Sequence, residues 1–144
     1  MSSPLIERLT DELGYPRLSE ANFESFIKDA PYSVLFFTEN AARFPESNDV
    51  AVILPELVKR FPMLSPAVID THYEKSLQGR YNFTVWPTLV FLKEGRYLGA
   101  IPKVQNWDDY VREITILLTL EPRRDPGIGI PVVAVGSEPS GCAG

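Results

Sequence analysis

The segment YNFTVWPTLVFLKEGRY, which spans residues 81–97, decides how this protein folds. Residues 88–92 within it form a short apolar run rich in β-branched and aromatic side chains, which predicts a buried strand, and Glu94-Gly95 is a hairpin turn signal. Because proline cannot donate to a sheet ladder, Pro87 belongs at the first position of that strand or at a sheet edge. The segment therefore predicts a proline loop, a buried strand, a tight turn and a second strand.

The composition is that of an ordinary folded domain. The sequence has 144 residues, of which 44% are hydrophobic and 23% are charged, and this is enough for one domain with its own core. The formal net charge of −5 argues against a surface that binds the phosphates of a nucleic acid. An acidic protein suits cationic partners better, although mild acidity is also common among folded proteins.

Few residue types that carry out chemistry are present. Cys142 is the one cysteine and His72 the one histidine, so the sequence has no internal disulfide, no Cys-x-x-Cys pair and no evident metal ligand set. No catalytic triad or phosphate-binding glycine loop is recognisable, and we expect no metal and no cofactor. The N-terminal residues lack the apolar core of a signal peptide, and no apolar run is long enough to cross a bilayer. We therefore expect a cytoplasmic protein without membrane insertion.

Apolar spacing and capping residues place the remaining elements. The expected helices are residues 4–13, 20–29, 47–61 and 107–120, with a short helix or turn at 71–77, and the expected strands are residues 16–18, 33–38, 65–70, 88–92 and 96–101. Ser3, Ser19 and Asn106 are suitable N-caps for three of the helices, and Gly79 is expected to end the short one. The continuous apolar run within 33–38 predicts a central strand that is covered on both faces.

The composition changes after Leu120. Residues 121–144 hold 4 of the 13 prolines and 5 of the 9 glycines, so little regular structure should persist there. We therefore divide the sequence into an N-terminal helix (1–14), one domain (15–120) and a Pro/Gly-rich tail (121–144) that is expected to be mostly mobile. The apolar stretch 128–135 in this tail is the part that could dock on the body or on a partner.

The order of strands and helices, with Trp86-Pro87-Thr88 before a hairpin, resembles the thioredoxin fold over residues 15–120. Alternating strands and helices independently predict an α/β domain, and the hairpin adds antiparallel strands, so we expect a central mixed sheet flanked by helices. The resemblance implies a cis Trp86–Pro87 peptide bond. It also aligns residues 41–44, Ala-Ala-Arg-Phe, with the redox Cys-x-x-Cys positions, so no thiolate is available there for thiol–disulfide exchange.

A narrower resemblance rests on three features together. These are Phe-Phe-Thr-Glu-Asn at residues 36–40, the missing cysteine pair, and Trp-Pro-Thr at residues 86–88. They resemble the thioredoxin-like accessory proteins of uptake nickel–iron hydrogenase maturation, the HyaE/HoxO/HupG type. The resemblance implies a non-catalytic chaperone. It also implies a protein partner, the hydrogenase small-subunit precursor, which carries a twin-arginine export signal.

The thioredoxin fold also suggests where such a partner would bind. The backbone of the residue before the cis-proline faces the former redox loop across a shallow groove, and an extended peptide can pair with that backbone as an added strand without any sulfur. The expected lining of this peptide-binding groove is Glu39, Asn40, Ala41, Ala42, Arg43, Phe44, Trp86 and Pro87. The alternative is that Trp86 and Pro87 only shape and fill the core.

Four carboxylates lie near this groove in the sequence, namely Glu39, Glu46, Asp49 and Glu56. Arginine pairs with carboxylates through two parallel hydrogen bonds, so some of them could contact the arginines of an export signal. The alternative is a solvated helix N-terminus, where acidic side chains are favourable in any case. Arg43 would weaken the negative potential of the group.

Two other classes of function fit the same fold. One is an interaction domain within a different complex. The other is a glutathione-using enzyme, in which a hydroxyl group such as that of Thr38 would activate glutathione. The sequence lacks the additional helical domain of glutathione transferases, which argues against the enzyme.

Overall fold

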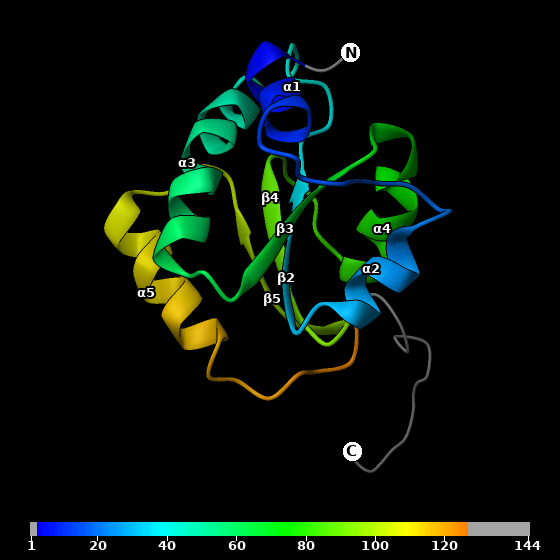
Figure 1. Cartoon of the computed structure of the whole chain (residues 1–144), viewed down its shortest axis with the longest axis vertical. Helices are drawn as coiled ribbons and strands as arrows, with labels where there is room; N and C mark the ends of the chain where they lie inside the picture. The colour runs from blue at the N-terminus through cyan, green and yellow to red at the C-terminus, as the bar shows by residue number, and fades with distance from the viewer. Residues whose placement is uncertain (1–2, 127–144) are drawn as a thin grey trace.

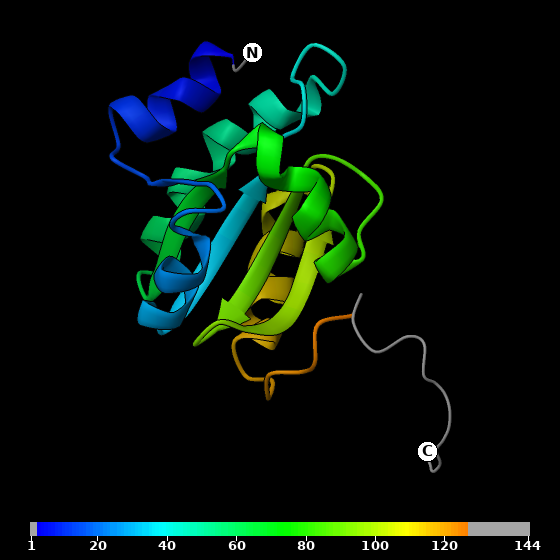
Figure 2. The same cartoon turned by 90° about the vertical axis from the view of Figure 1, so that its right-hand side faces the viewer.

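The computed structural model describes residues 3–126, so Cys142 and the apolar stretch 128–135 lie outside the described residues. A five-stranded sheet with helices on both faces forms its centre (Figure 1, Figure 2). The strands are β1 (Arg17–Leu18), β2 (Tyr32–Phe37), β3 (Leu64–Ile69), β4 (Thr88–Lys93) and β5 (Arg96–Pro102). They lie in the order β1-β3-β2-β4-β5, with β1, β3 and β2 parallel and β4 antiparallel to both of its neighbours. The predicted mixed α/β sheet is confirmed.

Five helices cover the two faces of this sheet. They are α1 (Pro4–Asp11), α2 (Phe23–Asp29), α3 (Glu46–Arg60), α4 (Glu74–Tyr81) and α5 (Trp107–Leu117), with a short 3₁₀ helix, η1 (Thr71–Tyr73), before α4. Figure 1 shows α1, α3 and α5 on one side and α2 and α4 on the other. None of the helices within residues 3–126 has the length and apolarity that crossing a membrane requires.

The central strand β2 joins the two halves of the core. Val34 and Phe36 are buried in the apolar cluster of α1, α3 and α5, and Leu35 and Phe37 are buried in the cluster of α2 and α4. All four side chains are 0% exposed. A strand that is covered on both faces reads as a continuous apolar run, which is the pattern from which this strand was predicted.

The start of α2 and the end of α4 differ from the prediction for identifiable reasons. α2 begins at Phe23 because the backbone carbonyl of Ser19 accepts hydrogen bonds from the N–H groups of Asn22 and Phe23, at 3.3 and 3.0 Å, which places the residues after Ser19 in a turn. α4 continues through Gly79, the residue expected to end it. It ends at Tyr81, and its C-cap residue Asn82 adopts the left-handed conformation with φ of 56° that asparagine tolerates better than most residues.

The last helix is shorter than expected. α5 ends at Leu117, and Tyr110 and Ile114 are its buried residues. Trp107, the first residue of the helix, is 43% exposed. The side chain of Asn106 makes no capping hydrogen bond, although Asn106 occupies the N-cap position.

The segment after α5 returns to the sheet. The backbone N–H of Arg123 donates to the carbonyl of Tyr97 at 2.7 Å and forms a single antiparallel bridge with β5. Asp125 forms an ion pair with Arg80 of α4 at 2.6 Å, and Arg80 forms a second one with Glu24 of α2 at 2.7 Å. The start of the predicted mobile tail is therefore bound to the body.

Replacing Leu9 with alanine should lower the free energy of unfolding by about 2–5 kcal/mol, because this side chain is fully buried between α1 and the rest of the core. Leu5 on the same helix is 40% exposed, and its replacement with alanine should cost about 1 kcal/mol or less. Urea unfolding followed by circular dichroism measures both. Equal losses for the two variants would contradict the docking of α1.

Candidate functional site

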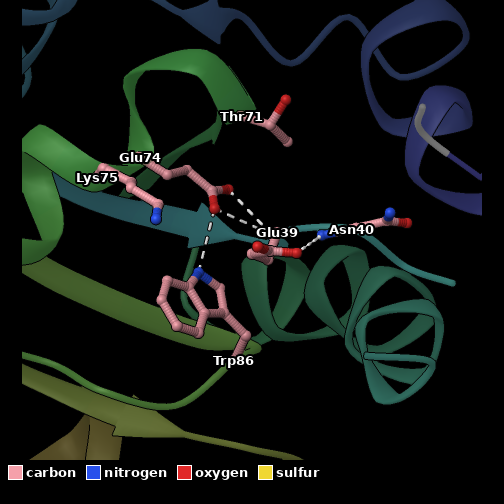
Figure 3. A pocket seen from close by; sticks show the side chains of 6 residues that line it. All are labelled: Glu39, Asn40, Thr71, Glu74, Lys75 and Trp86. Atoms are coloured by element: carbon pink, nitrogen blue, oxygen red, sulfur yellow. Dashed lines mark hydrogen bonds between the residues drawn. The ribbon is translucent and has the colours of Figure 1, made fainter. Parts of the chain in front are cut away.

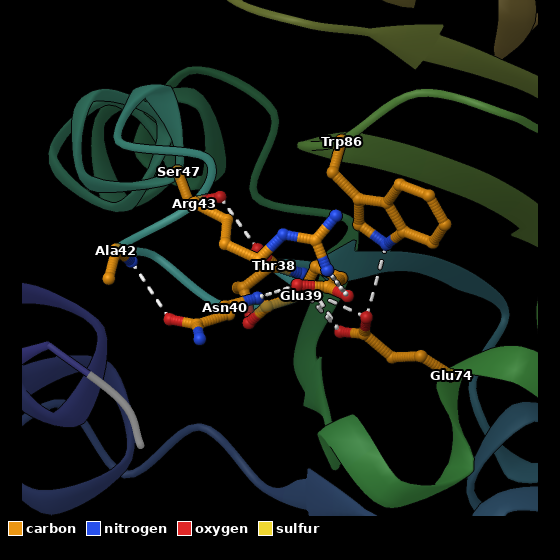
Figure 4. Close-up of polar contacts among 8 residues, drawn as sticks. All are labelled: Thr38, Glu39, Asn40, Ala42, Arg43, Ser47, Glu74 and Trp86. Atoms are coloured by element: carbon orange, nitrogen blue, oxygen red, sulfur yellow. Dashed lines mark hydrogen bonds and ion pairs between the residues drawn. The ribbon is translucent and has the colours of Figure 1, made fainter.

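The pairing of β2 with β4 brings two loops together. Phe37 at the end of β2 lies opposite Thr88 at the start of β4. The loop after β2, residues 38–45, and the loop before β4, residues 82–87, therefore meet at one end of the sheet (Figure 4). The peptide bond between Trp86 and Pro87 in the second loop is cis, as predicted.

Internal hydrogen bonds fix the shape of the loop after β2. The backbone carbonyl of Asn40 accepts from the N–H of Phe44, and its side-chain oxygen accepts from the N–H of Ala42, both at 2.9 Å. Ser47 Oγ in α3 donates to the carbonyl of Thr38 at 2.8 Å. These bonds connect the loop to itself and to the following helix, so it needs no disulfide to keep this conformation.

The predicted lining residues fall into two groups. Those that keep surface exposure are Glu39, Asn40, Ala42, Arg43, Phe44 and Trp86. Ala41 and Pro87 are buried, and Ala41 belongs to the apolar cluster of α1, α3 and α5. These two residues pack beneath the surface, and their side chains are not available to a ligand.

Trp86 stands between two hollows. The smaller, which we call the Glu74 hollow, has a volume of about 160 Å³ and is lined by Glu39, Asn40, Thr71, Glu74, Lys75 and Trp86 (Figure 3). The larger, which we call the Phe44 hollow, has a volume of about 380 Å³ and is lined by Arg43, Phe44, Pro45, Glu46, Thr84, Val85, Trp86 and Lys103. The ring centroids of Phe44 and Trp86 lie 5.7 Å apart. The indole is therefore a wall that both hollows share.

The backbone around Trp86 is only partly hydrogen bonded. The carbonyl of Val85 accepts from Thr88 Oγ1 at 2.6 Å, and the carbonyl of Pro87 accepts from the N–H of Lys103 at 2.7 Å. The hydrogen bonds found within residues 3–126 include none to the backbone N–H or carbonyl of Trp86 itself. These are the groups with which an added strand would pair.

Glu74 is a site residue that the sequence analysis missed, and it connects the two loops (Figure 4). Its side chain projects from the first turn of α4 and is 2% exposed. One carboxylate oxygen accepts from the N–H of Thr38 at 2.9 Å. The other accepts from the N–H of Glu39 at 3.0 Å and from Trp86 Nε1 at 3.1 Å. One buried carboxylate thus bonds to both walls of the predicted groove.

Burial is the largest cause of the raised pKa of the Glu74 carboxyl, which is about 7. The N–H donors of Thr38, Glu39 and Trp86 lower this pKa, and the negative charge of Glu39 raises it. Desolvation disfavours the charged form of an acid, whereas hydrogen bonds to the carboxylate favour it. Glu74 is therefore close to half ionised at neutral pH.

The four predicted acidic contacts do not lie together. Glu39 lines the Glu74 hollow and is paired with Arg43 at 3.6 Å, and Glu46 lines the Phe44 hollow. Asp49 is exposed in the first turn of α3. Glu56 is ten residues beyond Glu46 on the same helix, which is about 15 Å along its axis. The structure therefore brings Glu39 and Glu46 to the two hollows and places Glu56 far along the helix.

No group of three or more His, Cys, Asp or Glu side chains that could hold a metal ion is found within residues 3–126. His72 lies in η1, where its Nδ1 is 3.1 Å from a carboxylate oxygen of Asp70, and its side chain is 96% exposed. It lines neither hollow.

The mixed sheet, the cis-proline loop and the sulfur-free loop opposite it define a thioredoxin-like domain without the redox pair. Solved structures agree with this fold. Mitochondrial thioredoxin 3 from Saccharomyces cerevisiae matches with a TM-score of 0.61 at 19% identity, over 72% of this chain and 96% of the thioredoxin. The HupG protein from Rhodopseudomonas palustris, described as a putative hydrogenase expression/formation protein, matches with a TM-score of 0.52 at 38% identity, over 72% and 94%.

The chain belongs to the HyaE family, whose model is described as hydrogenase-1 expression protein HyaE and matches residues 5–110. The hydrogenase expression/formation protein HoxO from Azotobacter vinelandii is 48% identical over 99% of this chain and 95% of its own length. HupG from Rhizobium leguminosarum, also a hydrogenase expression/formation protein, is 36% identical over 83% of each protein.

The stability of the wild-type protein should fall relative to Glu74→Gln as the pH rises from about 4.5 to about 7. The folded protein keeps the proton of Glu74 up to about pH 7, whereas the unfolded protein loses it near the ordinary value of 4.5. The unfolded protein therefore binds fewer protons in this window, and raising the pH favours unfolding. The full shift corresponds to about 3 kcal/mol.

Urea unfolding of both proteins at about pH 4.5, 6 and 8 measures this difference. The difference should level off above the pKa of the folded protein. A difference in stability that is the same at all three values would contradict the raised pKa of Glu74.

Proposed function

We propose that this protein is a non-catalytic chaperone of nickel–iron hydrogenase maturation that binds the hydrogenase small-subunit precursor and its twin-arginine export signal. Family membership and the hydrogenase expression/formation relatives support the role in maturation. The observation that carries the binding role is the backbone of Trp86, whose N–H and carbonyl take part in no hydrogen bond within residues 3–126. The loop that contains Trp86 lies opposite the loop of residues 38–45. A precursor that still carries its export signal is in the cytoplasm, so the protein acts there.

The peptide is bound by strand addition. Its backbone pairs with the N–H and carbonyl of Trp86, and its side chains alternate between the protein and solvent. Phe44 and the indole of Trp86 give the Phe44 hollow an aromatic wall that can cover apolar side chains of the signal. No step in this mode requires a sulfur, which fits alanine, alanine, arginine and phenylalanine at residues 41–44.

The acidic side chains on this surface support the proposal that part of it binds a cationic ligand. Glu39 and Glu46 each line one of the two hollows. Arginine side chains of an export signal can form paired hydrogen bonds with such carboxylates. Arg43 and Lys103 line the Phe44 hollow as well, so the more negative place for an arginine is the side of Glu39.

The binding role predicts that the full-length small-subunit precursor is retained by this protein and that a precursor without its export signal is retained less well. Phe44→Ala should weaken retention about tenfold or more, because it removes the aromatic wall next to Trp86. Isothermal titration calorimetry with both forms measures this. If neither form binds, the proposal fails; if an unrelated partner binds instead, the protein serves a different complex.

Charge-reversal variants test whether the position of an acidic residue determines its effect on peptide binding. Glu39→Lys and Glu46→Lys should each weaken binding of a synthetic twin-arginine peptide by about fivefold or more, with a loss that shrinks at high salt. Glu56→Lys is the matched control, since it changes the net charge equally but lies far along α3. Fluorescence anisotropy of a labelled peptide measures all three. Equal effects of the three variants would show that only net charge matters.

A further inference from the structure

We propose that Glu74 is the positioning residue of the peptide groove: its carboxylate holds the Trp86 indole and the backbone of residues 38–39 in the arrangement that binds peptide. This inference rests on the proposed function, because it names the residue that orients the groove. It does not make Glu74 a contact residue. Glu74 acts through Trp86 and through the loop after β2.

The geometry assigns this role to one side chain. Glu74 accepts three hydrogen bonds at 2.9–3.1 Å, one from Thr38, one from Glu39 and one from the indole of Trp86, with a further, longer contact of 3.2 Å to the N–H of Glu39. Thr38 and Glu39 begin one wall of the groove, and Trp86 is the other wall (Figure 3, Figure 4). The helix that supplies Glu74 is separate from the two loops that form these walls. Its carboxylate therefore bridges the two walls and orients the indole of Trp86 relative to residues 38–39.

The donors of Thr38, Glu39 and Trp86 approach both oxygens of Glu74, so both oxygens must be hydrogen-bond acceptors. A carboxylate has acceptor lone pairs on both oxygens, whereas glutamine has one acceptor oxygen and one donor NH₂ group. If Glu74 were glutamine, its NH₂ group would face the N–H of Thr38 in one orientation and the N–H of Trp86 in the other. Either orientation leaves a donor without an acceptor and pushes one wall away.

Burying a carboxylate is costly unless hydrogen bonds compensate for its lost hydration. At Glu74, the compensating bonds found within residues 3–126 come from the residues of the groove walls. Within residues 3–126, no basic side chain forms an ion pair with Glu74. The energy of the buried charge therefore depends on the placement of the groove walls as well as on its burial.

The charged groups that face Glu74 come from two elements. Glu39 lies on the loop after β2, with Arg43 paired to it on the outer side, and Lys75 lines the same hollow from α4. Among the described residues, the Trp86 loop contributes no charged side chain to this hollow. Since the pKa of Glu74 is about 7, protonation near neutral pH removes one acceptor from this network and loosens the walls. The arrangement that binds peptide is the ionised one.

A test that needs no partner follows the indole N–H resonance of Trp86 by NMR in a Trp107→Phe background, which leaves one tryptophan. Trp107 is 43% exposed and lies away from the groove lining. The resonance should shift with pH, with a midpoint near the pKa of Glu74, and Glu74→Gln should abolish that midpoint. A resonance that is independent of pH between about 5 and 9 would overturn the proposal. If Glu74→Gln does not fold, the titration of the background protein alone decides.

Binding provides the second readout. If only the ionised form binds, affinity for a twin-arginine peptide should rise about tenfold between about pH 6 and 8 in the wild type and stay level in Glu74→Gln. At about pH 8, Glu74→Gln should bind about tenfold more weakly. Glu20→Gln, an exposed carboxylate on the turn before α2, is the matched control and should match the wild type.

The two proposals fail in different ways. If the wild type binds no peptide or precursor at any pH, the proposed function fails, whereas the indole titration still reports on Glu74. If the wild type binds and Glu74→Gln binds equally well with the same pH profile, the positioning role of Glu74 is wrong and the proposed function stands. A loss of affinity in Glu74→Gln that Glu20→Gln shares would also overturn the positioning role.

Discussion

The antiparallel pairing of β4 with β2 is the contact on which the candidate site depends. It sets Phe37 opposite Thr88, so the polypeptide leaves β2 at the point where it enters β4. Because side chains alternate between the faces of a strand, a shift of one residue in this pairing would turn every core side chain of β4 to the opposite face. The burial of β4 therefore fixes the register. The register in turn fixes the position of Trp86 relative to the loop after β2.

In the loop after β2, hydrogen bonds hold a conformation that a disulfide could hold in a redox-active protein of this fold. Asn40 closes the loop, Ser47 connects it to α3, and the buried carboxylate of Glu74 connects it to Trp86. Ala41 fills space in the core where a reactive side chain would need access. The loop is therefore built as a fixed surface. This arrangement suits binding, in which the groups that meet the ligand must be in place before it arrives.

Much of the fold could be predicted from the sequence because apolar spacing is a local property. The run at residues 33–38 and the hairpin at 88–101 have one interpretation each, and both are confirmed. Helix ends were less predictable, since they depend on single hydrogen bonds. Ser19 closes a turn instead of starting a helix, and Asn82 ends α4 where Gly79 was expected to end it.

The candidate site was predictable only where it follows from the fold. Trp86 and the exposed residues of the loop after β2 were predicted as site residues because a strand end and a proline loop mark them. Glu74 was missed because an acidic residue in the first turn of a helix has an ordinary explanation in the helix dipole. One signal could have identified it. β3 is parallel to β2, so the residues that follow β3 lie at the same end of the sheet as those that follow β2.

Backbone pairing alone cannot tell one extended peptide from another, since every peptide has the same backbone. For the proposed function, selectivity must come from the two hollows beside Trp86, which differ in charge. Glu39 and Glu74 line one together with a single lysine, Lys75, and Arg43 and Lys103 line the other together with a single glutamate, Glu46. A bound peptide therefore meets a more negative surface on one side of the indole and a more positive one on the other. This difference gives the groove a direction, and an indole held by Glu74 keeps the two sides apart.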